Sequence, residues 1–357
     1  MNSSDKQASA GSAFAGSPNP WLAAWYGKRI WTFWLLPLTL VFIVLANARR
    51  YWIERYIQKR LVTPVIVVGN ISVGGTGKTP LLISLVKQLQ QQGYTPGVIS
   101  RGYGGTVSHY PYLLDASSTA AEAGDEPVTI YQQTGCNVCV GPDRIAAARL
   151  LEDQSCDVLV SDDGLQHYRL GRDIEIAVVD GQRGLGNGWR LPVGPLREPR
   201  SRLKTVDWVV VNSPAEHFVL PGLADLFYVP MQICAQDVIN LQTGEKVSAT
   251  EFGSTRVNAV AGIGNPQRFH TTLTQMGIAA ELHAFPDHHA FAASDLQFSN
   301  GFPVVMTEKD AVKCREFAQP NWFYVPIKAS LPDSFWLALQ QKLERVVEQK
   351  KTFLNQK

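Results

Sequence analysis

The sequence has 357 residues, of which 45% are apolar and 18% are charged, a globular composition long enough for two domains of ordinary size. The formal net charge is only +2, which argues against a protein that binds nucleic acid through bulk charge. Five cysteines in a chain of this length do not form a disulfide framework, so the composition indicates a reducing, cytoplasmic setting.

The N-terminal part combines a polar tail with an apolar run. Residues 1–20 are rich in Ser, Ala, Gly and Pro and predict a disordered tail rather than a signal peptide, because the apolar run starts late and no cleavage site follows it. Residues 30–48 carry no charge and would form a helix about 28 Å long, close to the hydrocarbon thickness of a bilayer. Pro37 would kink a soluble helix but is tolerated in a membrane helix.

The flanks of the apolar run favour contact with a membrane over the alternative of a buried core helix. Aromatic residues that resemble interfacial belts stand at both ends of the run: Trp31, Trp34, Tyr51 and Trp52. Seven basic residues and one acidic residue give residues 28–60 a charge balance of +6, and most of the basic residues follow the run. This asymmetry predicts that the catalytic part lies on the cytoplasmic side, whether the helix spans the bilayer or lies in one leaflet.

The central feature of the chain is a strand, a glycine-rich loop and a helix within residues 65–93. The β-branched run at residues 65–68 predicts a buried parallel strand, and the apolar spacing after Thr79 predicts a helix that ends near Gly93. This order is that of a phosphate-binding P-loop, in which glycines let backbone N–H groups close on phosphate oxygens at a helix N-terminus. Where the usual pattern starts with glycine, this chain has Ser72.

The loop predicts a site for a nucleotide with Mg²⁺. Lys78 would reach the β- and γ-phosphates, and Thr79 would offer its hydroxyl to Mg²⁺. The predicted nucleotide-binding residues are Ser72, Val73, Gly74, Gly75, Thr76, Gly77, Lys78 and Thr79. A second apolar strand, at residues 158–160, ends in Asp162 and Asp163, and a hard cation needs carboxylate oxygens at such a strand end.

Between these two strands, the role of the acidic segment is ambiguous from position alone. Asp125 and Glu126 precede a proline and are ordinary residues for the start of a helix, which is the simpler interpretation. The glycine-rich segment at residues 100–105 is either a site loop or an ordinary βα turn. Asp143, by contrast, clearly caps a helix over residues 141–151.

A long irregular loop at residues 183–203 is rich in Gly, Pro and Arg, and such loops in compact domains are usually functional. Arg197 and Arg200 are candidate phosphate clamps, because guanidinium groups suit phosphate oxygens. Strands predicted at residues 174–180 and 206–212 flank the loop, and the alternation of strands and helices predicts a doubly wound parallel sheet.

The pattern changes after residue 226. A hairpin that turns near Gly244 is predicted as a linker, and βα alternation restarts at residue 257. His288 and His289 follow an aspartate in a loop before another helix. They could ligate a metal, but a third ligand is missing, so an acid–base or orienting histidine is the better interpretation.

These patterns predict an α/β fold, with a P-loop NTPase-like doubly wound parallel sheet and a second, smaller α/β domain. The predicted parts are a disordered tail (1–20), an N-terminal membrane-associated helix (21–60), a P-loop core domain (61–225), a β-hairpin linker (226–256) and the smaller α/β domain (257–357).

Seven motifs occur in a fixed order after the N-terminal apolar segment: VGNISVGGTGKTP, SRGYGG, GDEP, SDDGLQH, LPVGPLREP, FPDHH and TEKD. In this order they resemble the tetraacyldisaccharide 4′-kinase family, the lipid A 4′-kinases of Gram-negative bacteria. The resemblance covers the chain from about residue 20 to its end, and the family shares the departure at Ser72.

The resemblance implies that the γ-phosphate of ATP, with Mg²⁺, moves to the 4′-hydroxyl of tetraacyldisaccharide 1-phosphate, giving lipid IVA. The lipid would stay in the bacterial inner membrane beside the N-terminal helix, with the catalytic domains on the cytoplasmic face. Asp125 would be the base or hydrogen-bond partner of the sugar hydroxyl, and His288, rather than His289, would pair with it on domain closure. The implied catalytic residues are Asp125, His288, Lys78 and Arg197, and the candidate Mg²⁺ ligands are Thr79, Asp162, Asp163 and Glu126.

Two other functions remain open from the residues. A soluble P-loop kinase or synthetase for a small molecule would share the glycine loop but would not need residues 30–48. A nucleotide-driven switch or metallochaperone would bind metal at Cys136 and Cys139, which form a CxxC, or at the two histidines. No second cysteine pair accompanies that CxxC, so two small residues on one strand is its main interpretation.

Overall fold

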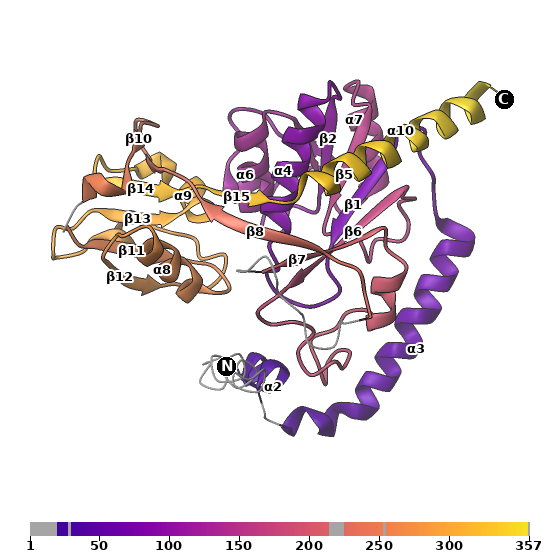
Figure 1. The fold of residues 1–357 in the computed structure, drawn as a ribbon, viewed down its shortest axis with the longest axis horizontal. Coiled ribbons are helices and arrows are strands. Elements are labelled where there is room, and N and C mark those ends of the chain that lie inside the picture. Colours follow the sequence, from indigo (N-terminus) through magenta and orange to yellow (C-terminus); the bar gives the residue numbers. More distant parts are fainter. Residues whose placement is uncertain (1–19, 28–29, 214–224, 253–254, 356–357) are drawn as a thin grey trace. The chain divides into compact units, whose positions relative to one another are not determined.

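The computed structural model describes residues 20–27, 30–213, 225–252 and 255–355 (Figure 1). The chain forms two compact units, each built from separate stretches of sequence. The first contains Met1–Lys78, Val158–Gln232 and Leu331–Lys357, and the second contains Thr79–Asp157 and Ile233–Ser330. Each unit draws on more than one of the predicted domains, whose boundaries stay a prediction. The predicted tail lies outside the described residues except for Pro20, which begins a helix.

Parallel strands form the core of the first unit, in the order β8-β7-β6-β1-β5. Their bounds are β1 Val65–Gly69, β5 Val158–Asp162, β6 Ile174–Asp180, β7 Trp208–Asn212 and β8 Val229–Ala235. β1 is buried along its whole length because β5 and β6 pair with it on either side, as its β-branched run predicts. Val68 of β1 lies opposite Asp162 of β5, so the loops that follow these strands leave the sheet at the same edge.

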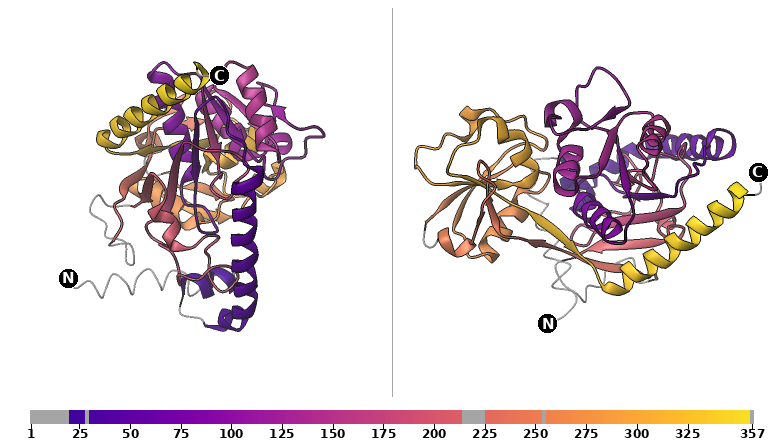
Figure 2. Two further views of the ribbon diagram at one scale, coloured as in Figure 1. Left: turned by 90° about the vertical axis from the view of Figure 1, so that its right-hand side faces the viewer. Right: turned by 90° about the horizontal axis from the view of Figure 1, so that it is seen from above.

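The helices of the first unit come from both ends of the chain and from the long loop. They are α2 Pro20–Tyr26, the 3₁₀ helix η1 Trp31–Leu35, α3 Leu36–Trp52, the π-helix η2 Ile53–Ile57, the 3₁₀ helix η3 Arg200–Lys204 and α10 Asp333–Asn355. α10, yellow in Figure 2, runs along the strands of this unit: the ring of Phe335 meets that of Trp208 edge-on with centroids 5.7 Å apart. Leu343 of α10 is fully buried, so the amphipathic helix serves packing.

The uncharged N-terminal run is not one regular helix. A 3₁₀ segment leads into α3, and Pro37 stands at the second position of α3, where its missing N–H costs no helical hydrogen bond. The helical stretch from Trp31 to Ile57 is long enough to cross a membrane, and its most apolar 18 residues have a mean hydropathy of 1.8 with only 11% of them buried. Most of its apolar surface therefore lies outside the protein core.

The second unit begins within α4 and carries two groups of strands. In the first group β2 pairs parallel with β4, and β3 pairs antiparallel with β4. The bounds are α4 Lys78–Gln91, β2 Pro96–Ser100, β3 Tyr112–Leu113, α5 Ala120–Ala123, α6 Asp125–Thr134, β4 Asn137–Val140 and α7 Arg144–Asp153. The predicted cap of α7 is confirmed, because the Asp143 carboxylate accepts hydrogen bonds from the amides of Ile145 and Ala146 at 3.0 and 3.3 Å.

The second group is a six-stranded sheet in the order β10-β9-β14-β13-β11-β12. Its strands are β9 Val238–Asn240, β10 Lys246–Val247, β11 Val257–Ala261, β12 Ala280–Ala284, β13 Val304–Thr307 and β14 Trp322–Val325. The other elements of this part are η4 Ala249–Phe252, α8 Pro266–Gln275, η5 Ala293–Leu296, α9 Glu308–Cys314, η6 Arg315–Phe317 and β15 Ile327–Ser330. Parallel and antiparallel strands with covering helices confirm the α/β fold.

The predicted hairpin near Gly244 is present, since β9 and β10 pair antiparallel and Gly244 has a φ of +75° at the turn. It is, however, more than a linker. β9 also pairs with β14, and Val238 is fully buried in the core of the six-stranded sheet. The hairpin thus extends the edge of the second sheet through backbone pairing, and Val238 adds to its core.

Candidate functional site

The glycine-rich loop between β1 and α4 has the backbone shape of a phosphate cradle. Gly74 and Gly77 have φ values of +105° and +93°, which residues other than glycine rarely adopt. A Cβ at Gly74 would stand 2.9 Å from the guanidinium of Arg183, whereas a Cβ at Gly75 would meet nothing within 4 Å. The loop therefore combines a constrained turn with open space beside its backbone.

Ser72 does not need to be glycine in this loop. Its backbone pairs with Leu196 in an isolated antiparallel bridge, and the next amide, that of Val73, donates to the carbonyl of Pro195 at 2.9 Å. The φ of Ser72 is not positive, so its backbone conformation does not require glycine. The departure from the usual pattern thus has a local cause, because extended pairing suits any residue.

Side-chain amides fix the two ends of the loop. Asn70 donates to the carbonyl of Gly74 at 3.2 Å, and Asn212, the last residue of β7, donates to the carbonyl of Thr76 at 3.1 Å. Both asparagines are buried. The carbonyls of Gly74 and Thr76 are therefore held by protein donors, which fixes the path of the loop backbone.

Lys78, Asp163 and Arg197, all predicted site residues, come together at the end of β5. The Asp163 carboxylate lies 3.5 Å from Lys78 Nζ and 3.0 Å from Arg197 Nη1. Asp163 has a φ of +45°, a conformation that non-glycine residues adopt mostly at functional or strained positions. Asp162, the last residue of β5, is only 3% exposed.

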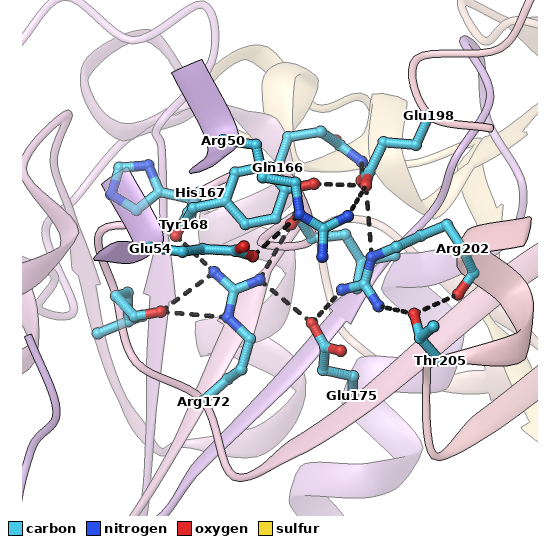
Figure 3. Close-up of polar contacts among 12 residues, drawn as sticks. Arg50, Glu54, Gln166, His167, Tyr168, Arg172, Glu175, Glu198, Arg202 and Thr205 are labelled. Atoms are coloured by element: carbon cyan, nitrogen blue, oxygen red, sulfur yellow. Dashed lines mark hydrogen bonds and ion pairs between the residues drawn. The ribbon is translucent and has the colours of Figure 1, made fainter. Parts of the chain in front are cut away.

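A network of polar side chains adjoins these three residues, and its part around Gln166, Tyr168 and Glu198 is drawn in Figure 3. Gln166 accepts a hydrogen bond from Arg197 at 3.3 Å and donates to the carbonyl of Asn70 at 2.9 Å and to Glu198 at 2.7 Å. Glu198 also accepts a hydrogen bond from the hydroxyl of Tyr168. The network therefore joins the residue that precedes the glycine loop, Asn70, to Arg197.

The network continues to the N-terminal helix. Arg50 of α3 lies 3.6 Å from Glu198 and stacks over the ring of Tyr168 at 4.8 Å, while Glu54 accepts a hydrogen bond from Arg50 at 2.9 Å (Figure 3). Arg202 reaches Glu198 from the other side at 3.3 Å. Burial, followed by the neighbouring Glu198, raises the pKa of Tyr168, so this phenol stays protonated and donates.

A second set of predicted residues meets within the second unit, at the start of α6. Asp125 is 5% exposed; its Oδ1 accepts the amide of Glu126 at 2.9 Å and its Oδ2 lies 3.1 Å from His288 Nδ1. His288 has a φ of +62°, and the ring of Tyr103 stands edge-on to it with centroids 5.3 Å apart. A buried carboxylate next to an imidazole held in a strained loop is suited to proton transfer.

The neighbouring histidine has a different partner. His289 Nε2 lies 3.1 Å from the carboxylate of Asp295, and its ring packs against Phe285 and Phe291 with centroids 4.9 and 4.8 Å away. The structure thus pairs Asp125 with His288, the choice that the family resemblance implied. The role of the pair in catalysis stays a prediction at this point.

Lys309, the second residue of α9, completes this second set. Its ammonium lies 3.6 Å from Asp125, 3.6 Å from Glu126, 3.4 Å from Asp287 and 3.3 Å from His288 Nε2. Burial opposes the positive charge, but the three carboxylates outweigh it and raise the pKa of Lys309. Glu126, predicted as a Mg²⁺ ligand, is here an ion-pair partner of this lysine.

Known proteins resemble this chain over most of its length. The family model described as Tetraacyldisaccharide-1-P 4'-kinase matches residues 31–344. A relative from Aeromonas salmonicida (strain A449), named Tetraacyldisaccharide 4'-kinase, is 49% identical over 332 residues, which span 89% of this chain and 95% of the relative. This chain belongs to the tetraacyldisaccharide 4′-kinase family. A relative of the same name from Legionella pneumophila (strain Lens) is 46% identical over 315 residues, 88% of this chain and 94% of the relative.

A solved structure extends the family likeness to three dimensions. The crystal structure of LpxK from Aquifex aeolicus in complex with ATP has a TM-score of 0.72 and 28% sequence identity, and the match covers 87% of this chain and 99% of that chain. The predicted family and its α/β fold are therefore confirmed.

Three residues of this tetraacyldisaccharide 4′-kinase family member make contacts that no sequence pattern assigned. Gln166, Glu198 and Lys309 all stand within motifs that carry the family resemblance, in SDDGLQH, LPVGPLREP and TEKD. Their position in those motifs was the only available signal, because each acts through partners that are remote in sequence. Arg200, a candidate phosphate clamp, instead contacts the carboxylate of Asp225.

The described residues contain no cluster of side chains that supports the alternative of a metal-binding protein. Among the described residues, no three His, Cys, Asp or Glu side chains lie together as a metal site. Cys136 and Cys139 are both buried, which raises the pKa of their thiols to about 11 and about 12. Thr79 follows Lys78 at the start of α4.

Proposed function

We propose that this protein transfers the γ-phosphate of ATP to the 4′-hydroxyl of tetraacyldisaccharide 1-phosphate and so forms lipid IVA. The family membership and the ATP complex of the Aquifex aeolicus relative support the reaction. The observation that carries the proposal is the buried Asp125 carboxylate held by His288, because it gives a sugar hydroxyl a base.

The residues of the glycine loop fit a nucleotide phosphate. Gly74 and Gly77 adopt the positive φ values that let a backbone curve around an anion, and Gly75 has open space beside it. In this proposal residues 72–79 hold the phosphates, and Lys78 and Arg197 supply the positive charge that phosphoryl transfer needs. Asp163 keeps both cations oriented before the nucleotide binds.

The carboxylate oxygens at the end of β5 and the hydroxyl oxygen of Thr79 in the first turn of α4 are hard ligands of the kind that Mg²⁺ prefers. Thr79, Asp162 and Asp163 are the residues that would hold the ion, with Glu126 as the further candidate. When bound, Mg²⁺ neutralises charge on the transferring phosphate.

On the acceptor side, Asp125 takes the proton of the sugar hydroxyl as the new P–O bond forms. His288 donates its Nδ1–H to Asp125 Oδ2 and so orients the carboxylate, while the amide of Glu126 holds the other oxygen. This positioning matters because a sugar hydroxyl is a poor nucleophile and transfer depends on alignment.

The lipid substrate gives α3 a function in this proposal. Thr39 is buried and accepts a hydrogen bond from the amide of Val193 at 3.3 Å, whereas Leu38, Val41 and Leu45 are more than half exposed. α3 thus presents polar groups to the protein and apolar groups outward, as expected for a helix with one face in lipid. We place it in the bacterial inner membrane, with the catalytic units on the cytoplasmic face.

The test is transfer of labelled phosphate from ATP, with Mg²⁺, to tetraacyldisaccharide 1-phosphate in detergent micelles. We expect a labelled lipid that disappears with Lys78→Ala, since that change removes the cation 3.5 Å from Asp163. Absence of a labelled lipid from folded protein that binds ATP would reject the acceptor but not the nucleotide site.

A further inference from the structure

The contacts of Lys309 decide which nitrogen of His288 carries the proton. A lysine ammonium has three donors and no acceptor. Its Nζ lies 3.3 Å from His288 Nε2, so that nitrogen must accept. In the neutral imidazole the proton is then on Nδ1, which faces Asp125 Oδ2 at 3.1 Å and donates to it.

The other tautomer would be unfavourable on both sides of the ring. A proton on Nε2 would point at the Lys309 ammonium, and the lone pair on Nδ1 would point at the Asp125 carboxylate. The carboxylates of Asp125, Glu126 and Asp287 lie within 3.6 Å of the Lys309 ammonium, so the positive charge that imposes this constraint is matched by its surroundings. The Asp287 carboxylate also lies 3.8 Å from Nε2, which is beyond hydrogen-bond distance, so the two contacts within that distance select the same tautomer.

His289 provides an internal contrast. Its Nε2, not its Nδ1, faces a carboxylate, that of Asp295 at 3.1 Å. Asp295 is ionised at neutral pH, because the amide of Ala292, followed by His289, lowers the pKa of its carboxyl. His289 therefore carries its neutral proton on Nε2, so adjacent histidines hold opposite tautomers.

Asp310 connects the two segments that carry Lys309 and His288. Thr307 caps α9 by accepting the amide of Asp310 at 3.2 Å, and its hydroxyl donates to the Asp310 carboxylate at 2.6 Å. The same carboxylate accepts the amide of Gly262 at 2.9 Å, and the carbonyl of Gly262 accepts the amide of His288 at 3.3 Å. Asp310 is fully buried, so the first turn of α9 and the histidine loop are held in one register.

We propose that Lys309 is a positioning residue for phosphoryl transfer, which fixes His288 in the Nδ1–H tautomer and thereby maintains the hydrogen bond that orients Asp125. The inference rests on the roles proposed above for Asp125 and His288. Lys309 acts through His288 and exchanges no proton with the substrate.

The tautomers are read from long-range ¹H–¹⁵N correlation spectra of the full-length protein, labelled with ¹⁵N-histidine, in detergent micelles. The chain has only seven histidines, and His288→Gln and His289→Gln assign the two signals. We expect His288 to be protonated on Nδ1 and His289 on Nε2. Lys309→Met should move His288 toward the Nε2–H form and leave His289 unchanged.

Kinetics of the same variants test the consequence. Lys309→Met should lower kcat at least about tenfold, a part of the 10²–10⁴-fold that general base catalysis supplies, with the KM for ATP unchanged. Lys309→Arg retains a charged donor and should restore both the spectrum and most of the turnover. If Lys309→Met does not fold, Lys309→Gln is the substitute, since it removes the charge but keeps an unbranched aliphatic stem with a polar end.

Several results would overturn the inference. Wild-type His288 with its proton on Nε2 would refute it without any variant, as would an unchanged His288 tautomer in folded Lys309→Met. A shifted tautomer with normal turnover would remove the positioning role. If Asp125→Asn is inactive in that last case, the proposed function stands and only the inference fails; if wild-type protein makes no labelled lipid, the proposed function fails while the spectra still report the tautomer.

Discussion

Replacement of Asp125 by asparagine separates the proposed base from every other feature of the site. The side chain is 5% exposed and keeps its shape in the variant, and the amide oxygen can still accept the backbone N–H of Glu126, now at 2.9 Å. What disappears is the negative charge beside His288 and Lys309, which lie 3.1 and 3.6 Å away. Asp125→Asn therefore removes the proton acceptor with little change in packing.

The expected loss follows from that single function. General base catalysis contributes about 10²–10⁴-fold, so kcat should fall by about that factor. At about 1.4 kcal/mol for each factor of ten, the barrier rises by about 3–5 kcal/mol. ATP affinity should not change, because every residue of the glycine loop is retained.

The assay is the transfer of labelled phosphate to the lipid in micelles, with ATP binding measured on the same samples. Asp295→Asn is the matched control, since it breaks a carboxylate–histidine contact of the same 3.1 Å length in the neighbouring pair. The control should keep normal turnover. Asp125→Asn with a kcat within about threefold of the wild-type value would refute the assignment of the base.

Three further predictions concern stability and membrane contact. Asp143→Ala removes the cap of α7 and should lower the free energy of unfolding by about 1 kcal/mol, measured by denaturant titration; an unchanged midpoint would contradict the cap. The pKa values of Cys136 and Cys139 rise on folding from 9.0 to about 11 and about 12, so the unfolded thiols lose their protons first and stability should fall as pH rises above about 9. Melting curves between pH 8 and 11 test this, and Cys→Ala variants with the same pH slope would exclude the thiols as its cause. Val41→Ser with Leu45→Ser should weaken binding to phospholipid vesicles at least about tenfold with no change in Tm, since both side chains are exposed; undiminished vesicle flotation would place that face outside the lipid.

Features that depend on neighbours in sequence could be predicted. The β-branched residues of β1 and the Asp143 cap of α7 are each determined by a few consecutive side chains, and both are present. The Ser72 departure was visible in the sequence, but its cause was not, because the bridge to Leu196 joins segments that are distant along the chain.

The site could be predicted only in part, for the same reason. Asp125 and His288 came from the family resemblance, while position alone made Asp125 an ordinary residue at the start of a helix. Lys309 likewise stands in the first turn of a helix, α9, where a charged residue is ordinary. Its contacts with Asp125 and His288 arise only from folding. A one-dimensional pattern cannot distinguish a charge at a helix start from a charge that organises a distant ring.

The membrane contact proposed for α3 has a practical consequence for the preparation of this enzyme without detergent. Removal of the residues before position 60 would take Arg50 away from Glu198 and Tyr168, so the buried Glu198 would lose one of its two arginine partners. Exchange of the outward residues Leu38, Val41 and Leu45 for polar ones would leave those inner contacts intact. Substitution of the exposed apolar residues of α3 is therefore a better route to a water-soluble form than deletion of the helix.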